Sequence, residues 1–189
     1  PACGRTKRFR GIRRSGERLS VEMLLGTTVR ELLEEIADDI PVRTIRAIHI
    51  GGPSGVTLGP DCFDVPLDST ALRQLGGHLG TGGLAIFDDT ACPVAFARSL
   101  IRFCADESCG TCPPCRIGTR EVLDILDRFE DGRADRADLQ RLETLCRHVA
   151  ETSLCEHGRT ATHVVSTGLR WIREVYEDHL DGRGCPVGC

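Results

Sequence analysis

Length, composition and charge limit what this chain can be. Its 189 residues, 40% of them hydrophobic, suffice for one good core or two small ones. The formal net charge of −4 and an aromatic content of 4% argue against a nucleic-acid-binding surface. Eleven cysteines, without a signal peptide or an apolar run long enough for membrane insertion, indicate bound metal in a reducing compartment. We therefore expect a cytoplasmic protein, either soluble or peripheral to a membrane complex.

The chain opens with a basic segment. Residues 1–18 are rich in arginine and lack apolar periodicity, which is typical of a solvated basic arm. A docking segment for an acidic partner or a phosphate is the alternative. Because the first residue is Pro1 rather than Met, we expect the chain to be a trimmed piece of a longer protein.

A small domain of strands and one helix is predicted over residues 19–89. Alternating Leu19, Val21 and Met23 predict a strand, and Thr28 with Glu31 forms a capping-box pattern ahead of a helix. The apolar face of that helix consists of Val29, Leu32, Leu33 and Ile36. Further strands are expected at 45–50 and 84–87. This order of elements within about seventy residues is typical of a β-grasp domain.

Residues 90–180 change to helical periodicity. The apolar spacing predicts helices over 94–103, from the cysteine loop to Gly132, over 134–150 and over 161–180. Four antiparallel helices with short links predict a four-helix bundle, and a cysteine-containing tail follows over 181–189. The expected fold class is therefore α+β, with a small β-grasp domain followed by a helical domain.

Three cysteines lie in one loop, in the string Glu-Ser-Cys-Gly-Thr-Cys-Pro-Pro-Cys-Arg at residues 107–116. The C-x2-C-x2-C spacing of Cys109, Cys112 and Cys115 is that of iron–sulfur cubane ligands. A bacterial ferredoxin would place its next cysteine three residues further on, where this chain has threonine, so the fourth ligand must come from a distant segment. Cys155 is the first choice because it lies in a short polar loop between two predicted helices. Cys146, on a predicted helix, is the alternative.

Spacing alone leaves other uses of the triplet open. Zinc also binds four thiolates, although structural zinc sites usually pair two separate two-cysteine knuckles. A disulfide between two of the three cysteines would leave the third thiol over.

The other cysteines and two histidines give weaker signals. Cys185 and Cys189 lie four residues apart on a Gly/Pro turn and could chelate zinc together with a histidine or another cysteine. A frayed tail without function is the alternative. His157 and His163 flank the Cys155 loop, either as loop or cap residues or as hydrogen-bond donors to a cluster. Two cysteines fall on predicted helices as small buried side chains, Cys104 and Cys146, and three carry no spacing signal, Cys3, Cys62 and Cys92.

Four short motifs follow one another along the chain. They are Gly-Gly-Pro-Ser-Gly at 51–55, Leu-Gly-Thr-Gly-Gly at 79–83, Cys-Ala-Asp-Glu-Ser-Cys-Gly-Thr-Cys-Pro-Pro-Cys-Arg-Ile-Gly-Thr at 104–119 and Ser-Leu-Cys at 153–155. In order and approximate spacing they resemble the family of NADH-binding flavoprotein subunits of respiratory complex I and of NAD-linked hydrogenases and formate dehydrogenases. The resemblance implies a soluble-ligand-binding β-grasp domain followed by a helical domain that holds one 4Fe–4S cluster. In that family the cluster ligands correspond to Cys109, Cys112, Cys115 and Cys155.

The chain also departs from that family. The flavoprotein subunit carries FMN and NADH on a large domain ahead of the β-grasp segment, and neither its glycine-rich flavin loop nor its acidic stretch occurs here. We therefore expect no FMN or NAD(H) on this chain and no catalysis by it alone. The expected role is to pass single electrons between a flavin-carrying subunit and a further iron–sulfur subunit. A structural or docking subunit, whose cluster lies off the electron path, is the alternative.

Overall fold

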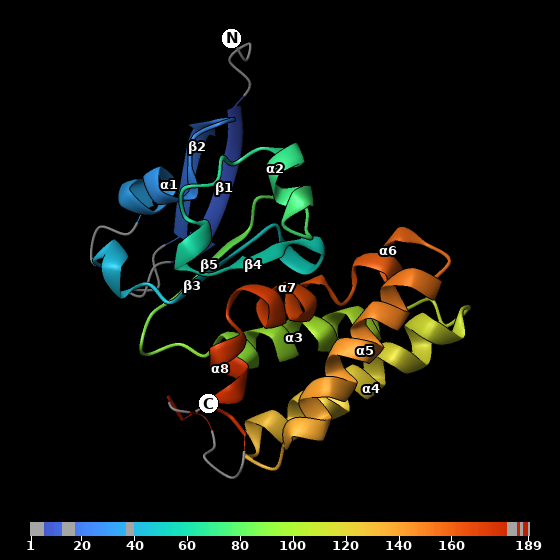
Figure 1. Cartoon of the computed structure of the whole chain (residues 1–189). Coiled ribbons are helices and arrows are strands. Elements are labelled where there is room, and N and C mark those ends of the chain that lie inside the picture. Colours follow the sequence, from blue (N-terminus) through green and yellow to red (C-terminus); the bar gives the residue numbers. More distant parts are fainter. Residues whose placement is uncertain (1–5, 13–17, 37–39, 181–184, 186, 189) are drawn as a thin grey trace.

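The computed structural model describes residues 6–12, 18–36, 40–180, 185 and 187–188, and it places a strand-rich part above a helical part (Figure 1). In these residues, β1 (Thr6–Ile12) pairs with β2 (Arg18–Leu24) as an antiparallel hairpin. A second sheet has β3 (Ala47–Ile50) at its centre, flanked by β4 (Val56–Leu58) and β5 (Leu84–Phe87), with both pairs antiparallel. The predicted mixture of strands and helices is confirmed.

Strand β1 lies in the segment that was expected to be a solvated arm. Its side chains alternate in exposure, with Arg8 and Arg10 exposed and Phe9 buried between them. The Arg10 backbone N–H donates to the Gly82 carbonyl at 2.9 Å, and a parallel bridge joins Arg10 to Gly83. The arginines therefore occupy the solvent face of a strand whose other face is anchored by one aromatic side chain.

The predicted helix after the first hairpin is confirmed as α1 (Val29–Ile36). Its capping box is formed reciprocally, since the Thr28 backbone N–H donates to Glu31 Oε2 at 2.7 Å and the Glu31 backbone N–H donates to Thr28 Oγ1 at 3.1 Å. The four apolar residues expected on one face are the buried ones. A short helix that was not predicted, α2 (Ser69–Gln74), begins at an Asp68 cap.

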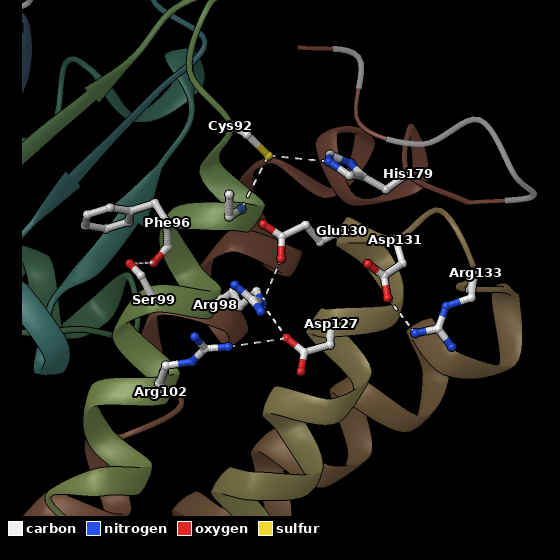
Figure 2. Close-up of polar contacts among 11 residues, drawn as sticks. Cys92, Phe96, Arg98, Ser99, Arg102, Asp127, Glu130, Asp131, Arg133 and His179 are labelled. Carbon is white, nitrogen blue, oxygen red and sulfur yellow. Dashed lines mark hydrogen bonds and ion pairs between the residues drawn. The ribbon is translucent and has the colours of Figure 1, made fainter. Parts of the chain in front are cut away.

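Three long helices form the body of the helical part. They are α3 (Pro93–Asp106), α4 (Pro113–Glu130) and α5 (Arg136–Thr152), and they confirm the first three predicted helices. Arg98 on α3 forms ion pairs with Asp127 and Glu130 on α4, the latter at 2.9 Å (Figure 2). These contacts hold α3 and α4 together at the end away from the cysteine loop.

The single helix expected over residues 161–180 is wrong. The chain instead forms α7 (His163–Trp171) and α8 (Arg173–Glu177), preceded by a short α6 (Glu156–Thr160). The break falls at Ile172, whose backbone angles of φ −141° and ψ 43° are not helical. A side chain on Gly168 would lie 2.7 Å from the Tyr176 hydroxyl, so the turn folds the tyrosine ring back against a glycine that leaves room for it.

Strand β3 separates two hydrophobic cores. Ile48 and Ile50 belong to the core beneath α1, whereas Ala47 belongs to the core of the helical part. On the helical side, the Thr57 backbone N–H donates to Thr167 Oγ1 at 2.9 Å, which ties β4 to α7. The second sheet therefore packs between α1 and the helical part. None of the helices in the described residues is long and apolar enough to cross a membrane.

Candidate metal centre

The four cysteines predicted to hold a cluster lie on two loops at helix starts. Cys109 is in the loop between α3 and α4, Cys112 is the N-cap residue of α4, and Cys115 is in the first turn of that helix. Cys155 is the N-cap residue of α6. Cys112 and Cys115 are buried, whereas Cys109 and Cys155 are exposed. Each loop therefore presents its cysteines at the beginning of a helix.

Contacts between the two loops bring Cys155 to the triplet. The backbone N–H of Leu154 donates a hydrogen bond to Cys112, which lowers the pKa of that thiol. A side chain on Gly158 of α6 would meet the Cys115 Cβ at 3.1 Å, so the short helix packs directly against the triplet. Burial raises the pKa of Cys115 and a Ser108 hydrogen bond lowers it, while the nearby charges of Cys112, Cys155 and Cys109 raise it further. The structure thus gathers all four thiols, although Cys155 is forty residues from Cys115 in sequence.

The triplet loop is shaped by its own hydrogen bonds. Gly110 adopts φ +77°, a left-handed conformation that glycine tolerates, and the Arg116 guanidinium donates to its carbonyl at 3.0 Å. Ser108 Oγ lies 3.3 Å from Cys115 Sγ. A hydrogen bond with the Thr111 side chain, 3.4 Å from the Cys109 sulfur, lowers the pKa of that thiol. These bonds shape the loop around Cys109 and Cys115, and the lowered pKa of Cys109 favours its thiolate form.

The surroundings suit an iron–sulfur cluster. Four thiolates are the complete ligand set of a cubane, and the positive N-terminal end of the 18-residue α4 favours negative charge beside Cys112 and Cys115. Ser153 Oγ is buried without a hydrogen-bond partner and lies beside the position that a Gly158 side chain would take, close to Cys115. A buried hydroxyl of this kind needs an acceptor, which a cluster sulfide would provide.

The spacing of these sulfurs also bears on whether the site would bind a cubane or a single metal ion. Among the residues that the structure describes, the one trio of Cys, His or acidic ligand atoms within 4.8 Å of one another belongs to Cys92, His179 and Cys185. No three of the four cysteines at the helix starts therefore have their sulfurs within 4.8 Å of one another. A cubane accounts for wider spacing because each thiolate binds a different iron.

The alternative fourth ligand, Cys146, is a buried residue of α5. Burial of Cys146 raises the pKa of its thiol to about 12, and hydrogen bonds with Ser166 and Thr162 partly offset this effect.

The two histidines near the Cys155 loop contact other elements. His157 Nε2 lies 2.9 Å from the Cys104 carbonyl oxygen, which ties α6 to the end of α3. His163 Nδ1 lies 3.4 Å from the Ser54 carbonyl oxygen and its ring stacks on His78. In these contacts both histidines connect elements of the fold.

The second predicted site has an unexpected composition. Cys185 lies close to Cys92 and His179, two residues that the sequence did not connect with it, and Cys189 lies outside the described residues. Burial lowers the pKa of His179, but hydrogen bonds with Cys92, Val175 and Cys185 outweigh it and raise that pKa to about 9. No sequence spacing could identify this group, because Cys92 is 87 residues from His179.

We expect Gly158→Ala to lower the iron content of the protein by at least about twofold. The added methyl would lie 2.6 Å from Ser153 Cβ and 3.1 Å from Cys115 Cβ, so α6 would have to move away from the triplet. Iron per chain measures the effect. Gly83→Ala is the matched control, because its nearest neighbour would be 3.7 Å away, and iron content equal in the two variants would contradict the prediction.

Comparisons with known proteins point to one family. Residues 95–179 match the family model described as the NADH-ubiquinone oxidoreductase-F iron-sulfur binding region. The chain is 35% identical over 168 residues to the NADP-reducing hydrogenase subunit HndC of Solidesulfovibrio fructosivorans, covering 88% of this chain and 34% of that protein. It is 36% identical over 165 residues to the F subunit of the NADH-quinone oxidoreductase of Streptomyces coelicolor, covering 87% of this chain and 37% of that protein.

A solved structure agrees with the sequence relatives. The subunit matched in the H2-reduced NAD+-reducing NiFe-hydrogenase superposes with a TM-score of 0.78 at 29% identity, covering 93% of this chain and 30% of that one. The chain spans about a third of the length of the curated relatives it matches. The resemblance expected from the four motifs is confirmed.

Proposed function

We propose that this chain, whose residues 95–179 are an iron–sulfur binding region of the NADH-ubiquinone oxidoreductase F type, is a one-electron relay module of a multisubunit NAD(H)-linked oxidoreductase. The observation that carries the proposal is the meeting of Cys155 with the triplet at the start of α4. Cys109, Cys112, Cys115 and Cys155 would hold one 4Fe–4S cluster, which supplies one-electron transfer when bound.

The residues around the thiolates influence how readily an electron is accepted. The N-terminal end of α4 and the Leu154 backbone N–H both favour added negative charge near Cys112. Pro113 and Pro114, at the first positions of α4, have no backbone N–H to donate to a sulfur. Their fixed φ angles instead preserve the spacing between Cys112 and Cys115.

The exposed side of the four-cysteine group suits contact with partner subunits. Cys109 and Cys155 face solvent, and three large apolar side chains on the flanking segments are also exposed: Phe103 at 50%, Ile117 at 52% and Leu154 at 74%. Exposed apolar side chains near a functional site favour protein contacts. A flavin-carrying subunit or domain and a further iron–sulfur subunit are the partners that an electron relay needs.

We also propose that the strand-rich part is a β-grasp domain. The parallel bridge between β1 and the start of β5 would join the two small sheets in the order β2-β1-β5-β3-β4, with the outer hairpins antiparallel, as in a β-grasp domain. We place this domain at residues 6–89, so that it includes β1 from the basic segment. Residues 90–180 would form the helical domain, in which α3, α4, α5 and α7 correspond to a four-helix bundle.

The experiment is to purify the chain anaerobically and to measure its iron, sulfide, visible spectrum and flavin content. We expect about four irons and four sulfides per chain and visible absorption that bleaches with dithionite and returns in air. No flavin fluorescence after denaturation and no NADH oxidation with an artificial acceptor are expected. A colourless protein with zinc at these cysteines would favour the structural or docking alternative. Stoichiometric FMN would overturn the assignment as a relay only.

A further inference from the structure

We propose that Cys92, His179 and Cys185 form a second metal centre, a structural zinc site that pins the segment after α8 to the start of α3. The three residues come from separate parts of the chain: Cys92 is the N-cap residue of α3, His179 follows α8, and Cys185 lies near the C-terminal end. Their ligand atoms all lie within 4.8 Å of one another. The site is distinct from the four-cysteine group and does not depend on the proposed electron relay.

The distance between two of the ligand atoms fits a shared ion. Cys92 Sγ lies 3.4 Å from His179 Nε2, and the two side chains point toward each other (Figure 2). With a Zn–S bond of about 2.3 Å and a Zn–N bond of about 2.0–2.1 Å, a tetrahedral ion separates such atoms by roughly 3.5 Å. The pair shares a hydrogen bond at this separation, so zinc would displace the shared proton with little movement of either atom.

The imidazole has the orientation of a metal ligand. His179 Nδ1 lies 2.7 Å from the Val175 carbonyl oxygen, which can only accept, so Nδ1 carries the hydrogen. The other nitrogen, Nε2, is the one that faces Cys92. A backbone carbonyl that fixes the tautomer in this way is the usual outer partner of a zinc-bound histidine.

Cys92 is also held in place. The Ala95 backbone N–H, in the first turn of α3, donates to Cys92 Sγ at 3.4 Å. This bond orients the sulfur across the helix start toward His179 and offers a donor to a negatively charged ligand. The sulfur is thus positioned before any ion binds.

The space between these side chains matches a single ion. A cavity of about 10 Å³ is lined by Cys92, His179 and Cys185, which is room for one water-sized particle and too little for an organic ligand. His179 is only 1% exposed, and both cysteines are partly buried. A buried thiolate and imidazole set of this kind favours zinc over hard cations such as magnesium or calcium.

The position of the site defines its role. The 14 residues of α3 extend for about 21 Å, and the four-cysteine group lies beyond the other end of this helix. Zinc has no redox chemistry in proteins, and a metal ion bound by residues from separate segments contributes directly to folding. Zinc at Cys92, His179 and Cys185 would therefore stabilise the contact between the start of α3 and the segment after α8, without taking part in electron transfer.

The test is metal analysis of the full chain produced with both zinc and iron in the medium. We expect about one zinc per chain in addition to iron. Cys92→Ser and Cys185→Ser should each lower zinc by at least about fivefold and leave iron unchanged, whereas the Cys109→Ser/Cys155→Ser double variant should lose iron and keep zinc. Cys62→Ala, in the other core, is the matched control and should keep both metals.

X-ray absorption at the zinc edge provides a second measurement that does not depend on a variant folding. We expect sulfur neighbours at about 2.3 Å together with nitrogen at about 2.0 Å. Wild-type protein without zinc, or zinc that stays in both Cys92→Ser and Cys185→Ser, would overturn the proposal. A Cys92–Cys185 disulfide in protein purified under reducing conditions would overturn it as well.

Discussion

Cys155→Ala should abolish the cluster or convert it, lowering the iron content from about four atoms per chain to three or fewer. In the proposed ligand set Cys155 is the residue at the start of the short α6, and its charge acts on the buried Cys115 thiol. Without it, the fourth iron would lose its protein ligand. Iron, sulfide and the visible spectrum of the anaerobically purified variant measure the loss.

Cys146→Ala is the matched comparison for this prediction. Cys146 is the other cysteine considered as fourth ligand, but it is buried on α5 with Thr162 and Ser166 as hydrogen-bond partners. We expect this variant to keep its iron and to lose on the order of 1 kcal/mol of stability from the small cavity. Loss of the cluster in Cys146→Ala together with its retention in Cys155→Ala would show that the ligand assignment is wrong.

Removal of iron should loosen the helical part from about residue 92 onward and leave residues 19–88 protected from amide exchange. Metal binding contributes to folding when its ligands come from separate segments, and here the two loops are about forty residues apart. The largest changes should occur at 107–118 and 153–161, where the loops meet. Amide exchange measured by mass spectrometry, with and without iron, tests this.

The strand-rich part provides the internal control for that experiment. Its core contains Ile48, Ile50 and the buried face of α1, and none of the four cysteines. The hydrogen bond between Thr57 and Thr167 joins this part to α7 of the helical part. Equal loss of protection on both sides of residue 89 would show that the two parts unfold as one unit.

Local patterns predicted much of this fold. The capping box of α1, its buried face and strand β5 depend on neighbouring residues, so sequence spacing identifies them directly. The Cys109–Cys112–Cys115 triplet is local in the same sense. Cys155 could be proposed because it lies in a polar loop between helices, where a cysteine is not needed for core packing.

The features that sequence analysis missed depend on distant contacts. Strand β1 looked like an arm because its exposed arginines dominate the segment, whereas the burial of Phe9 on the other face depends on distant contacts. The break at Ile172 could not be seen, since Leu169, Ile172 and Tyr176 keep helical spacing across it. Cys92 and His179 meet only because α8 folds back toward the start of α3.

The difference in length between α4 and α6 has a consequence for how the protein acquires iron. Cys112 and Cys115 are carried by a helix of 18 residues, whereas Cys155 precedes one of five, which is too short to be stable without its neighbours. In the newly made chain, we therefore expect the triplet to be presented first and the Cys155 segment to close last.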